Sequence, residues 1–375
     1  MLGSLLGFVD WVYPFVIMIT PIVFFHELGH FAVARYFGVK VEMFSIGFGP
    51  EIAGWTDKKG TRWKLSWIPL GGYVKFFGDL DAASQPDREK LQTISPAERA
   101  AAFPFKPLYQ RALVVAAGPV ANFVLAVVIF TLLFMAVGQL VTPPVVGQVT
   151  KGSAAAAAGV HPGDVIRAID AQPVASFQDM QRIVSLNSGD PLAIALDRKG
   201  AMLTVRATPR LTAVKDRFGN SYRIALLGIS ALSDPKATRV VHPGPLAAVG
   251  QAFGEVGYVL ETVLNYRVQL IRGTADASQL SGPVGIFKMS HDVASVSLIA
   301  LVNLAALISV SIGLVNLFPI PILDGGHLLY YGCEAVLGRP LSARAQDIGF
   351  RLGLAVMLGL MLFATWNDLV RLNLF

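Results

Sequence analysis

Four long stretches of apolar residues divide the chain. They cover residues 11–37, 112–141, 298–323 and 348–369, and they contain few charged side chains. A helix needs about 20 residues to cross the apolar layer of a bilayer. The pattern therefore predicts a polytopic α-helical membrane protein with about four transmembrane helices.

Charged residues return between the first two apolar stretches. Residues 41–50 and 63–68 have strand-like patterns, and Asp57-Lys58-Lys59-Gly60 between them is typical of a hairpin turn. We therefore expect a membrane-associated β-hairpin. Its edge can accept an extended peptide by strand addition, or it can be a plain surface hairpin. Residues 79–106 are rich in charged side chains and are interpreted as a polar linker.

Residues 145–235 have the pattern of a small inserted α+β domain. Pro162-Gly163-Asp164 predicts a turn, and residues 177–186 suit a helix. Residues 191–196 and 201–207 suit two strands that pair across Lys199-Gly200. Residues 244–272 carry apolar side chains near one face, which predicts an amphipathic helix on the membrane surface or against the inserted domain.

Composition agrees with a membrane protein. Of the 375 residues, 54% are hydrophobic and 15% are charged, whereas soluble domains average roughly 25% charged residues. The net charge of +6 fits basic residues that flank membrane spans, and no basic and aromatic stripe favours a nucleic-acid partner. Because Cys333 is the single cysteine, an intramolecular disulfide is excluded and a metal site must use histidine and carboxylate ligands.

The basic residues also predict an orientation. Those near span ends are Arg35, Lys40, Lys106, Arg111, Arg339, Arg344 and Arg351. They lie in the loop after the first span and in the loop before the last one, so both loops are expected on the cytoplasmic side. The N-terminus lacks a basic region and a cleavage site, so we expect the first apolar segment to be retained as a span.

The first apolar stretch contains His26-Glu27-Leu28-Gly29-His30, which has the form H-E-x-x-H. On a helix, residues four apart share a face, so His26 and His30 can reach one metal ion. Glu27 can act as a base on water at that metal. The alternative is a polar helical turn whose histidines have other partners. Ionisable groups inside a membrane-length apolar segment are costly and usually functional, which favours the metal site.

A further candidate ligand follows the third apolar stretch, where Pro319 and Pro321 break the helix. Asp324 can be the third ligand of a His-His-Asp site with one position open for water. It can instead be an interfacial carboxylate that caps the next segment.

The second apolar stretch contains Gly118-Pro119-Val120-Ala121-Asn122. Glycine and proline permit a close helix crossing, and an asparagine amide can hydrogen-bond across it. Packing is the expected role of Asn122, and a substrate contact is the alternative.

Together these motifs resemble the site-2 protease family of intramembrane zinc metalloproteases, in particular its bacterial RseP-like branch. The resemblance rests on H-E-x-x-H, on Gly118 to Asn122, on Asn316 through His327 with its Leu323-Asp324-Gly325-Gly326 core, and on an insert that resembles a PDZ domain. Many RseP-like proteins carry two PDZ domains, whereas this chain has room for one clear copy.

The resemblance implies Zn²⁺ as cofactor, with His26, His30 and Asp324 as zinc ligands and Glu27 as the catalytic base. Candidate substrate-binding residues are Asn316, Gly71 and Gly72. The hairpin is expected to re-enter the membrane and present substrate as a strand, and the insert is expected to restrict access to shortened substrates. His327 is expected to support a metal ligand or the fold and not to be a fourth ligand.

The resulting division of the chain has seven segments. They are a first transmembrane helix with H-E-x-x-H (1–37), a cytoplasmic loop with the hairpin (38–107), a second transmembrane helix (108–141), a periplasmic PDZ-like domain (142–235), an amphipathic helix and linker (236–295), a third transmembrane helix with L-D-G-G (296–328), and a loop with the fourth transmembrane helix (329–375).

On this resemblance we expect a zinc metalloendopeptidase of the bacterial inner membrane that acts in regulated intramembrane proteolysis. Its active site is expected near the cytoplasmic side, and its partners are the lipid bilayer and transmembrane substrates such as an anti-sigma factor or remnant signal peptides. One alternative is a catalytically silent PDZ-containing membrane scaffold, which would not need all four residues of the predicted site. A metal transporter would show ligands along a path or an internal repeat, and we find neither.

Overall fold

The computed structural model describes residues 2–79, 93–187, 189–215, 221–232, 238–272, 277 and 280–371. Most of the predicted polar linker, residues 80–92, therefore lies outside the described residues. The chain forms two compact units. The first unit combines Met1–Phe130 with Leu280–Phe375, and the second is Thr131–Gln279.

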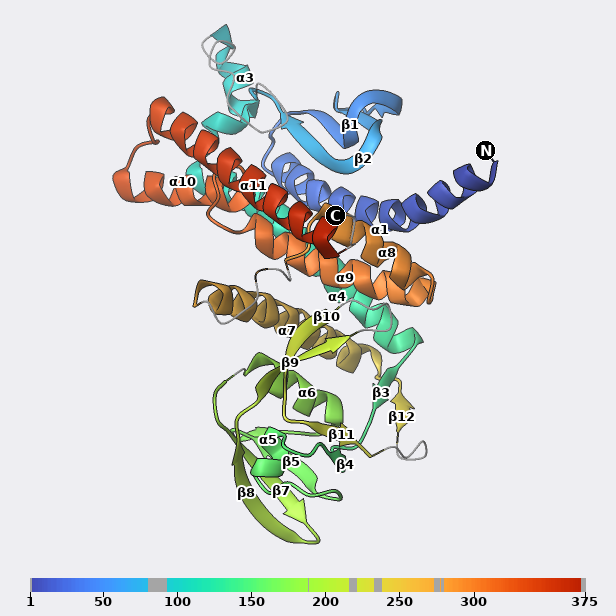
Figure 1. Ribbon diagram of the computed structural model, residues 1–375. Helices are drawn as coiled ribbons and strands as arrows, with labels where there is room; N and C mark the ends of the chain where they lie inside the picture. Colours follow the sequence, from blue (N-terminus) through green and yellow to red (C-terminus); the bar gives the residue numbers. More distant parts are fainter. Residues whose placement is uncertain are drawn as a thin grey trace. The chain divides into compact units, whose positions relative to one another are not determined.

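Among the described residues, four helices are long and apolar enough to cross a membrane (Figure 1). They are α1 (Leu2–Tyr36), α4 (Leu108–Ala136), α9 (Leu298–Asn316) and α11 (Ala343–Arg371). Large apolar side chains such as Leu132 and Leu362 are exposed on them, as expected for surfaces that face lipid. The predicted class of polytopic helical membrane protein is confirmed.

The segment around L-D-G-G differs from the prediction of one helix over residues 296–328. Helix α9 ends at Asn316, residues 317–323 form a turn, and α10 (Asp324–Leu337) starts a new direction. Proline cannot donate the helical hydrogen bond, and its ring clashes with the preceding turn, so Pro319 and Pro321 force this break. Asp324 consequently begins a helix instead of ending one.

The two glycines of this motif allow the first turn of α10 to rest on the preceding backbone. A Cβ on Gly325 would lie 2.3 Å from the Leu317 carbonyl oxygen, and one on Gly326 would lie 2.3 Å from the Ile320 carbonyl oxygen. Any larger residue would push Asp324 away from its observed place.

The predicted hairpin is present as strands β1 (Val41–Thr56) and β2 (Arg62–Phe76), and its turn lies at the predicted residues. Its pairing is irregular, because residues 43–46 of β1 pair with both residues 62–65 and residues 72–75 of β2. The half near α1 is buried in a cluster with Phe44, Val74 and Phe76. The other half exposes apolar side chains, including Trp55 and Trp67.

The second unit contains the predicted insert. Its four-stranded sheet has the order β6-β5-β7-β8, and the strands are β5 (Val165–Ile169), β6 (Gln172–Pro173), β7 (Leu192–Arg198) and β8 (Ala201–Ala207). Three further antiparallel pairs join β3 (Gln139–Val141) to β12 (Arg239–Val241), β4 (Val146–Val149) to β11 (Ile229–Ala231), and β9 (Arg210–Lys215) to β10 (Ser221–Leu226).

Helices α5 (Ala154–Ala157), α6 (Phe177–Leu186) and α7 (Pro245–Ile271) complete this unit. The α6 bounds match the predicted helix, because the Ser176 side chain accepts the Asp179 backbone N–H and so caps the first turn. The β7 and β8 strands pair across Lys199-Gly200 as predicted. Buried Ile166, Ile194 and other apolar side chains form the core between helix and sheet.

Two predicted segments have other limits. The segment 108–141 is helical only to Ala136, since Gly138 adopts a left-handed conformation and the chain then enters β3. The segment 236–295 begins with strand β12 and ends with helix α8 (Pro283–Ala294) in addition to the predicted amphipathic helix. Two short elements, α3 (Pro96–Ala101) and η1 (Phe103–Phe105), precede α4.

Candidate metal centre and active site

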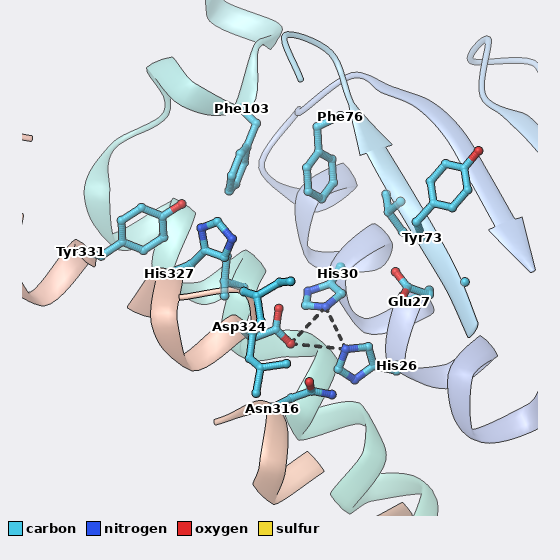
Figure 2. A pocket seen from close by; sticks show the side chains of 15 residues that line it. His26, Glu27, His30, Tyr73, Phe76, Phe103, Asn316, Asp324, His327 and Tyr331 are labelled. Carbon is cyan, nitrogen blue, oxygen red and sulfur yellow. Dashed lines mark hydrogen bonds and ion pairs between the residues drawn. The ribbon is translucent and has the colours of Figure 1, made fainter. Parts of the chain in front are cut away.

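Helices α1 and α10 bring three potential ligands together (Figure 2). His26 and His30 lie one helical turn apart on α1, and their Nε2 atoms are 3.3 Å apart. Asp324 is the first residue of α10, and its Oδ2 atom lies 3.3 Å from His26 Nε2 and 3.5 Å from His30 Nε2. The predicted ligand set is therefore assembled in space.

These distances fit a tetrahedral metal ion. Bonds of about 2.0–2.2 Å from zinc to nitrogen or oxygen place neighbouring ligand atoms about 3.3–3.6 Å apart. Asp324 Oδ2 is buried and accepts no hydrogen bond of normal geometry from the described residues. A buried carboxylate oxygen that lacks a hydrogen-bond donor and faces two imidazole nitrogens is suited to bind a cation together with them. The three donors leave a fourth position open.

Helix α4 forms the wall behind the two histidines. The Nδ1 atom of His30 donates to the Val114 carbonyl oxygen at 2.9 Å. The helices approach closely, because a Cβ on Gly29 would lie 2.2 Å from the Ala117 carbonyl oxygen. The glycine of the Gly118 to Asn122 motif was predicted to permit such a close crossing of two helices.

Asn122 has a contact that the sequence analysis did not assign. Its side-chain amide lies 3.2 Å from His26 Nδ1, and the residue is fully buried. Packing was the expected role and substrate contact the alternative, whereas the structure gives the amide a contact with a candidate ligand. The spacing of four residues between Gly118 and Asn122 was the available signal, since it places both on the α4 face that meets α1.

Glu27 lines the same cavity on the side of strand β2 (Figure 2). The Val74 backbone interacts with its carboxyl group. Gly72 is close by, because a Cβ there would lie 3.1 Å from Glu27 Cγ and 2.7 Å from the Ser45 carbonyl oxygen. The carboxylate is therefore fixed between the candidate metal ligands and the hairpin.

The cavity has a volume of about 210 Å³. Asn316, Gly72 and His327 line it together with Glu27 and the candidate ligands, whereas Gly71 does not. Gly71 instead faces the Phe48 ring, where a Cβ would lie 2.5 Å from a ring carbon. The aromatic side chains of Phe103 and Tyr331 close the end of the cavity beyond His327 (Figure 2).

The hairpin also offers a strand edge at this cavity. Gly72, Tyr73 and Val74 of β2 line the cavity, and the neighbouring partner of this segment is β1. Within the described residues, no second strand pairs with residues 72–76 on the opposite side. An extended peptide could hydrogen-bond to that edge beside Glu27.

Comparisons with known proteins identify the family of the chain. The model of peptidase family M50 matches residues 14–360. A protein of Agrobacterium fabrum named as a zinc metalloprotease is 46% identical over 367 residues, which cover 98% of this chain and 97% of that protein. A protein of Rhizobium meliloti with the same kind of name is 46% identical over 355 residues, covering 95% of each chain.

The metalloprotease MmpA of Caulobacter vibrioides is 40% identical over 396 residues, which cover 99% of this chain and 98% of that protein. Among solved structures, the PDZ domain of an SdrC-like protein from Listeria monocytogenes is 25% identical and covers 24% of this chain and 85% of its own, with a TM-score of 0.19. Because the family model and these relatives each cover nearly the whole chain, the protein belongs to peptidase family M50, the site-2 proteases.

Proposed function

We propose that this peptidase is a zinc-dependent intramembrane endopeptidase that hydrolyses peptide bonds in or near transmembrane segments. The observation that carries the proposal is the meeting of His26, His30 and Asp324 beside Glu27, in a unit built from apolar helices of membrane length. The names of the relatives add support for zinc as the metal.

In this proposal His26, His30 and Asp324 hold the zinc ion. The bound ion supplies Lewis-acid chemistry, in that it polarises the scissile carbonyl and makes water acidic enough to react near neutral pH. The donor set of two imidazoles and one carboxylate is a common one for catalytic zinc.

Glu27 acts as general base and then as general acid. It takes a proton from the attacking water and delivers it to the amine that leaves when the peptide bond breaks. Its place on the cavity wall supports this role, because the carboxylate faces the same space as the candidate ligands. Its neighbours Gly72 and Val74 restrict the positions that the carboxylate can adopt.

The substrate must present an extended backbone to this site. A transmembrane helix keeps its amides in internal hydrogen bonds, so a substrate has to unwind locally before attack. The edge at residues 72–76, with which no second strand pairs in the described part of the chain, can pair with the unwound segment. The proposed contacts of Gly72 and Asn316 with substrate fit their places on the cavity wall. Gly71 packs against the Phe48 ring and does not line the cavity.

We further propose that the substrates are membrane-anchored regulators, such as an anti-sigma factor, or remnant signal peptides. In this proposal the protein lies in the bacterial inner membrane and takes part in regulated intramembrane proteolysis. The basic residues of the first and last loops support a cytoplasmic location for the hairpin and for the adjacent active site. The insert is then periplasmic.

The insert is proposed to admit to the active site only those substrates that have already been shortened. A cavity of about 530 Å³ lies within this unit and is lined by α6, by residues 224–230 and by Tyr258. A groove between a helix and a strand can hold an extended chain end. The size of this cavity supports a peptide ligand.

Cleavage of a model single-span substrate in detergent tests the proposal. We expect the parent protein to cleave it and to contain one equivalent of zinc. Glu27→Gln should retain zinc and lose activity by several orders of magnitude, because it keeps the size of the side chain and removes the base. Freshly purified, folded parent protein without zinc would overturn the proposal and favour the non-catalytic scaffold.

A further inference from the structure

Three residues of α4 lie on the face of that helix that contacts the two histidines of α1. Val114, Gly118 and Asn122 are spaced four residues apart, so they form one stripe along the helix. Val114 contacts His30 through its carbonyl oxygen, Gly118 leaves room for the His30 ring, and Asn122 contacts His26. Each histidine thus turns Nε2 to the ligand cluster and Nδ1 to α4.

The hydrogen bond of His30 fixes its tautomer. A carbonyl oxygen can only accept, so the contact between His30 Nδ1 and the Val114 oxygen places the proton on Nδ1. The Nε2 lone pair is then free for a metal ion. A ring nitrogen that ligates a metal requires this arrangement, with the other nitrogen donating to a nearby acceptor.

His26 needs the same arrangement and has only a side-chain amide beside its Nδ1. Since Nε2 of His26 faces the ligand cluster, Nδ1 must carry the proton and needs an acceptor. With the amide nitrogen toward His26, two donors would face each other. The amide oxygen Oδ1 would then stay buried without a hydrogen-bond partner in the described part of the chain. Rotating the amide by half a turn places the oxygen on His26 Nδ1.

We propose that Asn122 is a positioning residue that accepts the Nδ1 proton of His26 through Oδ1. It thereby holds the tautomer and ring orientation in which Nε2 binds zinc. This inference rests on the proposed zinc site and adds a residue that supports one of its ligands.

The packing behind Asn122 supports this role. Helix α9 lies against the residue, because a Cβ on Gly313 would be 3.2 Å from Asn122 Cβ, and the Ser309 hydroxyl donates to the Asn122 carbonyl oxygen at 2.9 Å. The side chain is fully buried and faces α1. A fixed amide of this kind is suited to orient an imidazole ring.

Zinc affinity measured by competition with a chromophoric chelator tests the proposal independently of catalysis. Asn122→Leu removes the acceptor at similar volume, and we expect it to weaken zinc binding by about 10- to 100-fold. Asn122→Asp supplies a carboxylate that can only accept, so it should bind zinc at least as tightly as the parent. Ser309→Ala is the matched control, because it removes a contact of the Asn122 backbone and keeps the amide.

Three results would overturn the inference. If Asn122→Leu bound zinc as tightly as the parent, Asn122 would only pack between the helices, and the proposed function would be unaffected. Loss of affinity in Asn122→Asp equal to that in Asn122→Leu would mean that the amide donates to His26. Absence of zinc binding in the folded parent would remove both the proposed function and this inference.

Each affinity is scaled to the folded fraction from size-exclusion chromatography, so that a folding defect is counted separately. If the leucine variant does not fold, Asn122→Ala is the second variant that removes the hydrogen-bond acceptor.

Discussion

Gly118 and His30 meet so closely that a Cβ on Gly118 would lie 2.2 Å from His30 Nε2, the atom that faces Asp324. The glycine therefore belongs to the architecture of the metal centre, although it carries no functional group.

This contact predicts the effect of Gly118→Ala. The methyl group would force the His30 ring away from Asp324, and we expect zinc affinity and peptidase activity to fall by about tenfold or more. Zinc content and cleavage rate would be measured on the same sample. Gly359→Ala on α11 is a matched control, because a Cβ there meets no atom within 4 Å. Parent-like zinc content in Gly118→Ala would contradict the prediction.

The hairpin turn depends on Asp57, which accepts hydrogen bonds from the Arg35 guanidinium at 2.5 Å and from the Thr61 backbone at 3.0 Å. Burial alone would raise the pKa of Asp57. The hydrogen bonds from Thr61, Trp63 and Arg35 outweigh burial and lower the pKa to about 2. A carboxyl group with a lowered pKa in the folded state stabilises that state above its unfolded pKa of about 3.9.

We therefore expect the hairpin to keep its full stability from neutral pH down to about pH 4 and to lose this contribution as the pH falls toward 2. Fluorescence of the hairpin tryptophans would follow the change, since the Trp63 indole N–H donates to Asp57 at 3.3 Å. Asp57→Asn should remove the acid transition and weaken the hairpin already at neutral pH. If Asp57→Asn showed the same acid transition, a group other than Asp57 would be responsible for that transition.

Two arginine–aspartate pairs in the insert differ in burial and should differ in their effect on stability. Arg198 contacts both oxygens of Asp164 at 2.8 Å, and the Asp164 side chain is only 1% exposed. The hydrogen bond from Arg198 lowers the pKa of Asp164. Arg167 pairs with Asp197 at 3.0 Å, but its own side chain is 56% exposed.

Arg198→Met should lower the melting temperature of the insert much more than Arg167→Met. The first change leaves a buried carboxylate with its main charge partner removed, whereas the second breaks a surface pair. Differential scanning calorimetry of the full-length protein would compare the two variants. Equal shifts would show that the burial of Asp164 has no energetic consequence.

The buried carboxylate of Asp368 connects α11 to α8. One oxygen, Oδ2, accepts the backbone N–H groups of Gly282 at 2.9 Å and Gly285 at 2.7 Å, at the start of α8. The side chain is 2% exposed. Asp368→Ala should therefore cost about 1–3 kcal/mol of stability, because it leaves two N–H groups unsatisfied.

Asp368→Asn should cost less than the alanine change, since one amide oxygen can accept both hydrogen bonds. Thermal unfolding in detergent would rank the variants. If the asparagine variant were as unstable as the alanine variant, the negative charge and not the hydrogen bonds would be the main contribution.

Local patterns predicted those features whose cause lies within a few residues. The helical spacing of His26 and His30, the turn at Asp57 to Gly60 and the helix capped by Ser176 each follow from neighbouring residues. The position of Asp324 after an apolar run left a ligand and an interfacial cap both open, and the family resemblance implied the ligand. Its place at the start of a new helix depends on how the turn of residues 317–323 packs.

Features set by packing between distant segments were harder to predict. The contact of Asn122 with His26 depends on the crossing of α1 and α4, and the double pairing of residues 43–46 depends on register shifts along the hairpin. The end of α4 at Ala136 is also hidden in hydropathy, because Val137, Leu140 and Val141 continue the apolar run beyond it.

The edge of β2 beside Glu27 predicts how substrate sequence affects the rate. An intact transmembrane helix cannot pair with this edge, because its backbone N–H and C=O groups are already bonded to one another. A helix-breaking residue near the cleavage point lowers the cost of unwinding, and proline disfavours a helix by about 3 kcal/mol relative to alanine. Two single-span substrates that differ only by Gly or Pro against Ala at one position would test this effect.

We expect the substrate with Gly or Pro to be cleaved faster by the parent protein, with proline placed outside the bond that is cut. Circular dichroism of the two substrates in detergent would establish the difference in helix content, and Glu27→Gln would serve as the inactive control. Equal rates for two substrates of clearly different helicity would mean that unwinding does not limit the reaction. The strand edge at residues 72–76 would then have to act after that step, by holding a segment that is already extended.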